Sequence, residues 1–333
     1  MDIKTELLFD ESAEVEKITS QLRLNLRNNL HKRGYVVALS GGIDSSVSAA
    51  LAVKAVGFKK VFGLLLPEKD SSGNSSVLAK KLAEQLGIEY ELFDIAPTLE
   101  AIGCYKQRDQ AIRRIFPDYS DDWKSKIAIN GGQEGQFNHF NLLVQKPSGE
   151  LLEERMGLSE YLQVVAATNY KQRIRKTVEY FHADRLNYAV VGTPNRLEYD
   201  QGFFVKNGDG AADIKPIAHL YKTQVYALAR YLKLPPEICA AIPSTDTYSL
   251  PQGQDEFYFA LPYDKMDIAL SAYNRNVPIS ELSAALGISD KQSQWIYNDI
   301  EMKRKSTAPL HWKPLLIEPV NGPLTTPELL SLG

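Results

Sequence analysis

The chain of 333 residues is long enough to bury a substantial core, as one large domain or two modest ones. Its 44% of apolar and 24% of charged residues are the proportions of an ordinary globular protein. The formal net charge of −3 gives no basic field, which argues against non-specific binding to nucleic acid, and we expect no nucleic-acid partner.

The cysteines and the N-terminal residues favour a cytoplasmic protein. The two cysteines, Cys104 and Cys239, lie far apart without metal-ligand spacing, which argues against a disulfide framework or a zinc site and fits a reducing compartment. Residues 1–18 are acidic and lack the cationic and apolar regions of a signal peptide. No apolar run approaches the roughly 20 residues that span a bilayer, so we expect no membrane partner.

The first half of the chain alternates strand-like and helix-like segments. Helices are predicted over residues 45–56 and 77–86, the second closed by Gly87 as a natural C-cap. Short apolar runs are predicted as strands at residues 35–39, 61–66, 88–95 and 188–191. Apolar strands separated by helices predict an α/β fold with a parallel sheet flanked by helices, whose ligands lie at the carboxyl ends of the strands.

Two later regions depart from this alternation. Residues 130–158 are rich in glycine and polar residues and are predicted to form an insertion, as a loop or small hairpin. Residues 235–333 begin with a Pro-Pro pair and are predicted to be mainly helical or irregular, with an irregular tail from Pro309. The sequence shows no repeat or low-complexity tract, and residues 1–333 are predicted to form a single domain of the family that the motifs below resemble.

The strongest signal is the string Ser-Gly-Gly-Ile-Asp-Ser-Ser at residues 40–46, between a strand and a helix. Glycines let the backbone approach a ligand closely, and hydroxyls and free amides at a helix N-terminus hold phosphate oxygens. Asp44 adds a carboxylate where magnesium could bridge protein and phosphates. A glycine turn with Asp44 and Ser45 capping the helix explains Ser-Gly-Gly alone, but not the whole string in this setting.

A second candidate segment covers residues 192–213 and follows the strand at 188–191. It carries Glu198, Lys206, Asp209 and Asp213 close together in the sequence. Carboxylates for a metal or for proton transfer, with a lysine for a ligand phosphate, are typical of a site loop. Taken alone, the segment is better explained as a solvated loop whose charges pair with one another.

Together these segments resemble a known family. The string at 40–46 resembles the Ser-Gly-Gly-x-Asp-Ser loop of the N-type ATP pyrophosphatases, which cleave ATP between the α and β phosphates. Residues 192–213 carry Gly-Thr, Glu, then Gly-Phe-Phe-x-Lys-x-Gly-Asp-Gly and Asp in the order found in NAD synthetases, and residues 169–175 and 220–225 are also similar. The resemblance implies a Rossmann-like, adenine nucleotide alpha hydrolase-like fold. It also implies an ammonia-dependent NAD synthase, a ligase that uses Mg²⁺ and ATP to adenylate deamido-NAD and then aminates it, releasing AMP and pyrophosphate.

The resemblance also implies roles for single residues. The positions that match ATP-binding residues are Ser40, Gly41, Gly42, Asp44, Ser45, Ser46, Thr193, Lys222 and Ser244. The positions that match deamido-NAD-binding residues are Arg173, Lys206, Asp213 and Lys303. Asp44 and Glu198 match magnesium ligands. Lys222 is expected to stabilise charge during adenyl transfer, and Asp209 to position or deprotonate the attacking ammonium. Lys171 and Arg175, beside Arg173, are interpreted as a solvated basic face.

The resemblance bears on partners as well. Glutamine-using relatives carry a large N-terminal amidase domain, and the phosphate loop at Ser40 leaves no space for one. We therefore expect free ammonia as donor, unless a separate glutaminase delivers it, and the resemblance implies a homodimer. Met302 stands where the family has histidine, so adenylation is better supported than the identity of the acid. Two alternatives stay open: an ATP-pyrophosphatase amidotransferase acting on another carboxylate, and a non-catalytic nucleotide-binding subunit.

Overall fold

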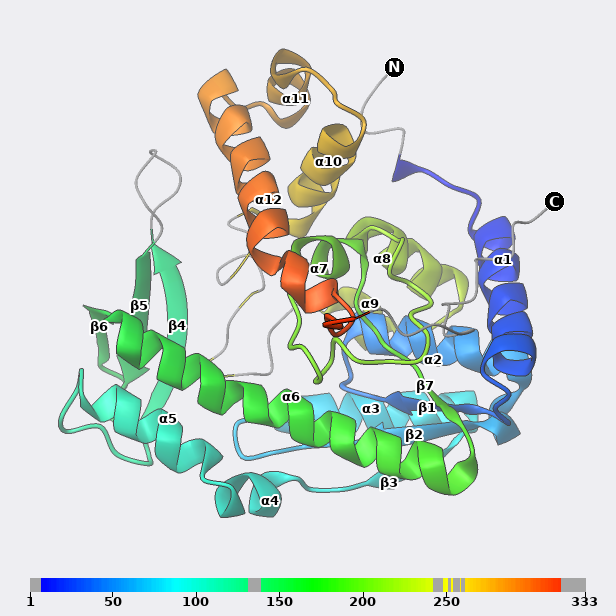
Figure 1. Ribbon diagram of the computed structural model, residues 1–333, viewed down its shortest axis with the longest axis horizontal. Coiled ribbons are helices and arrows are strands. Elements are labelled where there is room, and N and C mark those ends of the chain that lie inside the picture. Colours follow the sequence, from blue (N-terminus) through cyan, green and yellow to red (C-terminus); the bar gives the residue numbers. More distant parts are fainter. Residues whose placement is uncertain are drawn as a thin grey trace.

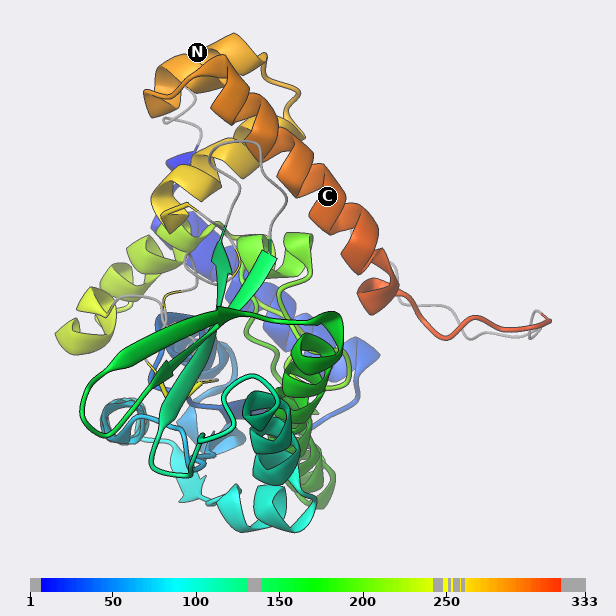
Figure 2. The same cartoon turned by 90° about the vertical axis from the view of Figure 1, so that its left-hand side faces the viewer.

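A computed structural model of the protein describes residues 7–130, 139–241, 248–250, 253, 258 and 261–318. Its elements form a parallel sheet with covering helices, a small antiparallel sheet and a helical C-terminal part (Figures 1 and 2). Among the described residues, no helix is both long and apolar enough to cross a membrane.

The parallel sheet has four strands in the order β3-β2-β1-β7. The strands are β1 (Tyr35–Ala38), β2 (Val61–Leu65), β3 (Glu89–Leu92) and β7 (Ala189–Val190). Tyr35 of β1 lies opposite Val61 on one side and Ala189 on the other, and all neighbouring strands are parallel. The predicted α/β fold is confirmed, because β1 and β2 are continuous apolar runs that are almost wholly buried, as central strands covered on both faces should be.

Helices cover both faces of this sheet (Figure 1). One face carries α1 (Glu11–Leu24), α2 (Ile43–Val56), α3 (Gly73–Leu86), α8 (Lys222–Tyr231) and α9 (Pro236–Ala240). The other carries α4 (Ala96–Ala101), α5 (Cys104–Arg113) and the long α6 (Leu158–Leu186). The short helices η2 (Asn25–Asn29) and η3 (Phe58–Lys60) lie in connections. Successive residues of β1 supply the two cores, since Tyr35 and Val37 belong to the first and Val36 to the second.

A separate antiparallel sheet precedes α6. It consists of β4 (Lys124–Asn130), β5 (His139–Gln145) and β6 (Leu151–Arg155), in the order β4-β5-β6. The sequence predicted a loop or small hairpin over residues 130–158, and the structure instead has a three-stranded sheet that begins already at Lys124. The sheet forms because Ile127, Leu142 and Val144 alternate with outward-facing residues and are buried against α5 and α6.

The C-terminal part packs around a core of its own. It contains α10 (Tyr263–Asn274), α11 (Ile279–Leu286) and α12 (Asp290–His311), and its core includes a residue of α7 (Arg196–Gln201). The prediction of an irregular chain from Pro309 was wrong for its first residues, because Pro309 lies in the last turn of α12 and interrupts little of the helix there. Arg304 of α12 pairs with Asp200 of α7 at 2.7 Å between Nη2 and Oδ2, which fixes α12 beside the site described next.

Candidate active site

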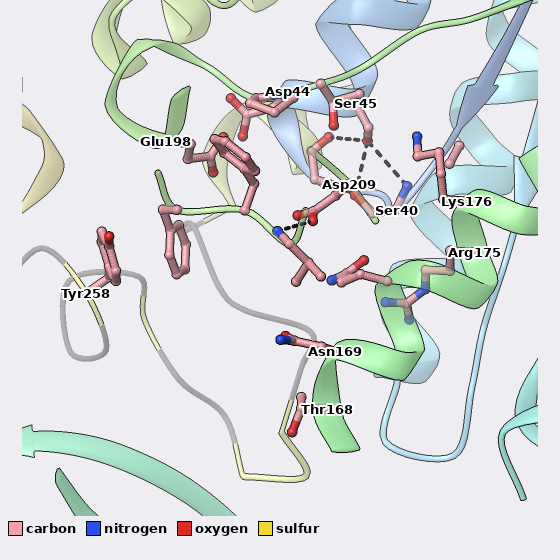
Figure 3. A pocket seen from close by; sticks show the side chains of 18 of the residues that line it. Ser40, Asp44, Ser45, Thr168, Asn169, Arg175, Lys176, Glu198, Asp209 and Tyr258 are labelled. Atoms are coloured by element: carbon pink, nitrogen blue, oxygen red, sulfur yellow. Dashed lines mark hydrogen bonds between the residues drawn. The ribbon is translucent and has the colours of Figure 1, made fainter. Parts of the chain in front are cut away.

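A large cavity lies at the carboxyl ends of the parallel strands, where an open α/β sheet binds its ligands. Its volume is about 1010 Å³, which lies at the upper limit of the roughly 300–1,000 Å³ typical of a pocket for one small ligand. Its walls come from the loop after β1, the end of β2, one face of α6, residues 202–209 and α12. Figure 3 shows side chains of several of these lining residues. The cavity is therefore as large as the pockets that bind a large small-molecule ligand.

The loop between β1 and α2 forms one end of this cavity. Gly41 has a φ of +78°, which glycine adopts without strain, and Gly42 is the N-cap of α2. The hydroxyls of Ser40 and Ser45 lie 3.1 Å apart, and the Gly42 N–H donates to Ser40 Oγ at 3.2 Å. These groups line the cavity at a helix N-terminus, which is the geometry predicted for holding phosphate. Ser46 differs, because its buried hydroxyl donates to the Gly42 carbonyl at 2.7 Å and does not line the cavity.

Two carboxylates and a buried lysine meet beside this loop. Lys222 is 1% exposed, and its ammonium forms an ion pair with the Asp44 carboxylate. Burial lowers the pKa of Lys222, but the Asp44 and Glu198 carboxylates outweigh this, so that the pKa lies above its ordinary value. Asn195 donates to Asp44 Oδ1 at 3.1 Å, and Glu198 forms a capping box with Asn195 at the start of α7. Sequence reasoning missed that Asn195 connects Asp44 to the start of α7.

Asp44 and Glu198 face the same part of the cavity (Figure 3). Magnesium sites commonly combine one or two carboxylates with substrate phosphates. These two side chains beside the phosphate loop offer that donor set, so the residues present fit a bound magnesium ion.

Asp267, 45 residues after Lys222 in the sequence, fixes the backbone at that lysine. Asp267 of α10 is fully buried and accepts hydrogen bonds from the N–H groups of Lys222 at 3.2 Å and Thr223 at 2.7 Å. Burial raises the pKa of Asp267 to about 6. Asp267 thereby caps the start of α8, a role that no local sequence pattern indicated.

Asp209 lies in the middle of the cavity, on the loop that follows α7 (Figure 3). Its Oδ1 accepts the Val205 N–H at 2.7 Å, which fixes the carboxylate. Burial raises the pKa of Asp209 above that of an ordinary aspartate. Nearby on α6, Lys176 and Glu179 form a buried ion pair of 2.7 Å and both line the cavity. Glu179 was not singled out from the sequence.

The residues predicted to hold the dinucleotide are only partly brought together. Arg173 and Lys206 line the cavity, where Arg173 Nε donates to the Lys206 carbonyl at 3.3 Å and Lys206 Nζ to that of Pro309 at 2.8 Å. Lys303 also lines the cavity and pairs with a neighbouring carboxylate of α12. Asp213 does not line it, because its carboxylate accepts the Val190 N–H at 2.7 Å.

The remaining predicted ATP contacts lie on either side of α7. Thr193 lines the cavity just before that helix. Ser244 falls outside the described residues.

A network of buried charges joins the loop after β2 to α5 and α6, next to the cavity. Lys171 was expected to be solvated, but it is 2% exposed and its ammonium lies 2.9 Å from Glu68 and 2.6 Å from Asp70. Arg108 of α5 pairs with the same Asp70 oxygen at 2.6 Å. Arg175, expected to be solvated as well, lines the cavity and donates to the Leu66 carbonyl at 3.2 Å. These contacts tie the loop after β2 to α5 and α6.

Comparison with known proteins decides the family. The family model described as NAD synthase matches residues 14–116 and 143–308. The chain belongs to the NAD synthase family. The NH(3)-dependent NAD(+) synthetase of Rhizobium meliloti is 56% identical over 315 residues, with 94% of each chain covered. The enzyme of the same name from Mesorhizobium japonicum is 53% identical over 311 residues, covering 93% of this chain and 98% of that one.

Two solved structures have the same fold as this chain. The NH3-dependent NAD synthetase from Campylobacter jejuni, in complex with the nitrate ion, has a TM-score of 0.59 at 23% identity and covers 93% of this chain and 100% of that one. The NMN synthetase from Francisella tularensis has a TM-score of 0.64 at 23% identity, covering 93% and 99%. The resemblance noted in the sequence and the Rossmann-like fold that it implied are confirmed.

Proposed function

We propose that this protein joins ammonia to the nicotinate carboxylate of deamido-NAD at the expense of ATP, giving NAD, AMP and pyrophosphate. The observation that carries the proposal is the 56% identity, over 94% of both chains, to an NH(3)-dependent NAD(+) synthetase. The cavity agrees with it, since a phosphate loop, a buried lysine and a fixed carboxylate line one site.

In the first half-reaction the carboxylate of deamido-NAD attacks the α phosphorus of ATP, and pyrophosphate leaves. Ser40, Gly41, Gly42 and Ser45 would hold the departing phosphates at the start of α2, with Thr193 and Ser244 as further ATP contacts. Lys222 would stabilise the negative charge that develops, because its ammonium is held in place by Asp44 and by the cap on α8. Asp44 and Glu198 would hold Mg²⁺, which when bound supplies positive charge to the phosphates. Ser46 would not touch ATP and would only support the loop, through its hydrogen bond to the Gly42 carbonyl.

In the second half-reaction ammonia attacks the acyl carbon of the adenylate, and AMP leaves as the amide forms. Asp209 would position or deprotonate the attacking ammonium, and the Val205 N–H holds its carboxylate in one orientation. A pKa raised by burial suits a carboxylate that takes up a proton during the reaction. Arg173, Lys206 and Lys303 would contact the dinucleotide, and Asp213 would support the strand below.

The finer features belong to the same proposal. Free ammonia is the amine donor, with a separate glutaminase as its possible source, and the protein acts in the cytoplasm, where its two free cysteines stay reduced. A homodimer is supported by the start of α6, where Leu158 and Leu162, one helical turn apart, are 73% and 54% exposed. Large apolar side chains left exposed along one helix are typical of a protein interface.

Exchange of labelled pyrophosphate into ATP tests the first half-reaction without ammonium. The wild type should catalyse exchange that requires deamido-NAD, because adenylation is reversible until an amine attacks. Asp209→Asn should keep this exchange and lose NAD formation, whereas Asp44→Ala should lose both. Exchange that is equally fast without deamido-NAD would contradict the proposed acid, and a screen of other carboxylates would follow.

A further inference from the structure

The α6 side of the cavity carries a buried ion pair that the proposed reaction does not use. Lys176 Nζ lies 2.7 Å from Glu179 Oε2, and both residues line the cavity although they are only 5% and 4% exposed. A buried ion pair adds little net stability, because withdrawing both charges from water costs about as much as their attraction returns. A pair placed against a ligand cavity is therefore better explained by what the cavity binds.

This pair lies at the reacting end of the cavity. Figure 3 shows Lys176 on the α6 side of the part of the cavity that also contains Ser45 and Asp209. Burial raises the pKa of Asp209, and the charge of Lys176 offsets part of that rise, so the ammonium is close to this carboxylate. Under the proposed function, the acid meets the α phosphorus between the phosphate loop and Asp209, because pyrophosphate leaves on one side and ammonia arrives from the other. Lys176 is therefore a cation beside the reacting carboxylate.

The ammonium of Lys176 has donors for a second anion. A lysine ammonium carries three N–H groups, and among the residues that the structure describes Lys176 donates to Glu179 alone. Other cations of the cavity wall have different partners, since Lys222 pairs with Asp44 and Arg175 donates to a backbone carbonyl. The remaining N–H groups of Lys176 can therefore bind an anion in the cavity.

Glu179 indicates which kind of anion Lys176 binds. The partner of Lys176 in the free protein is a carboxylate, which is also the reacting group of deamido-NAD. Burial raises the pKa of Glu179 despite the attraction of Lys176, so its negative charge is disfavoured there. Glu179 is thus a weak competitor for the ammonium when a substrate carboxylate enters.

We propose that Lys176 binds the nicotinate carboxylate of deamido-NAD and thereby selects the acid over its amide. This inference rests on the proposed function. The reaction turns a negatively charged carboxylate into a neutral amide, so a buried cation opposite this group distinguishes substrate from product. The same cation reduces the repulsion between the two anions that must meet, the carboxylate and the α phosphate. The product NAD lacks the charged contact and leaves more readily.

The test compares the KM for deamido-NAD with the inhibition constant of NAD, added as an inhibitor that competes with deamido-NAD, with pyrophosphate release as the measured rate. In Lys176→Met the KM for deamido-NAD should rise roughly 10- to 150-fold, as expected for the loss of a hydrogen bond to a charged group. The inhibition constant of NAD and the KM for ATP should each change by less than about threefold, because neither depends on the carboxylate.

Two further variants separate this effect from a loss of structure. Lys176→Met leaves Glu179 as a buried carboxylate without its cation, which can destabilise the fold. The double variant Lys176→Met/Glu179→Gln removes both charges and should show the same rise in the KM for deamido-NAD. Arg185→Met removes an exposed cation of α6 that does not line the cavity, and it should leave every constant unchanged.

Three outcomes would overturn the inference and leave the proposed function intact. Equal losses for deamido-NAD and NAD would mean that Lys176 only shapes the cavity. A rise confined to the KM for ATP would place Lys176 at the phosphates instead, and unchanged constants in the double variant would exclude a contact. A wild type that makes no NAD from deamido-NAD would refute the proposed function itself, and the same comparison of acid with amide would then be made on whichever acid releases pyrophosphate.

Discussion

Removal of the Asp44 carboxylate should destabilise the fold itself, apart from any effect on activity. The Lys222 side chain is 2% exposed and that of Asp44 17%, so the pair is largely withdrawn from water. Breaking a buried ion pair from one side costs about 3–5 kcal/mol, because the remaining charge is left uncompensated. We expect Asp44→Ala to lower the free energy of unfolding by about 3 kcal/mol, at the low end of that range, since Glu198 also acts on Lys222.

The opposite change should cost less, and the reason lies in the partners of Asp44. In Lys222→Met the carboxylate keeps its hydrogen bond from Asn195 and its partial exposure to water. We expect a loss of about 1.5–2 kcal/mol for this variant, at the low end of the range for a hydrogen bond to a charged group. The double variant should be more stable than the sum of the single losses predicts, by about 1–3 kcal/mol, because no buried charge is left alone.

Urea unfolding at pH 7, followed by tryptophan fluorescence, measures these four proteins. Lys222 is fully charged at this pH because its folded-state pKa is raised, so the pair contributes fully and would weaken only as pH rises through that pKa. Asp264→Ala is a matched control, since Asp264 also lies in the first turn of a helix but is exposed. It should cost no more than about 1 kcal/mol. Additive losses, or equal losses for the two single variants, would refute the reasoning.

Three further predictions concern single residues of the site. A Cβ at Gly41, where φ is +78°, would lie 2.5 Å from the Ser75 carbonyl oxygen. Gly41→Ala should therefore lower the free energy of unfolding by about 1–3 kcal/mol and raise the KM for ATP. An unchanged KM would count against phosphate binding by the loop between β1 and α2. Asp209→Asn should reduce kcat roughly 10²- to 10⁴-fold, and the wild-type rate, measured at a fixed concentration of free ammonia, should rise with pH through a pKa above that of an ordinary aspartate; a flat profile would exclude Asp209 as the base. Asp267 has a raised pKa of about 6, so the folded state binds the extra proton and stability conferred by this group is lost as pH rises from about 4 to 6. The wild type should therefore lose up to about 3 kcal/mol relative to Asp267→Asn over this interval in urea titrations, and parallel stability curves would contradict the assignment.

The central sheet and the phosphate loop were predictable because local patterns determine them. A strand buried on both faces must be a short apolar run, as at Tyr35–Ala38, and the glycines at 41 and 42 mark the turn into α2. The antiparallel sheet was harder to predict, because a half-buried strand such as β4 shows only a weak alternation. The end of α12 was also missed, since proline in a last helical turn resembles a stop signal.

The contacts within the site depend on pairings that the sequence does not contain. Asp267 reaches Lys222 from a helix in another part of the chain, and Lys171 finds its carboxylates on the loop after β2. Such long-range pairs follow from packing, so a local rule assigns a lysine to solvent by default. Asp213 shows the converse, because a motif position does not give the direction of a side chain, and this one bonds to the sheet.

The most direct test of the central claim is to mix the protein with deamido-NAD, ATP, Mg²⁺ and ammonium, and to follow NAD and pyrophosphate together. The account predicts that both products appear in equal amounts, only when deamido-NAD is present, and that Asp44→Ala abolishes both. Pyrophosphate without NAD, or neither product while ATP still binds, would contradict the claim that this protein makes NAD by adenylation and amination.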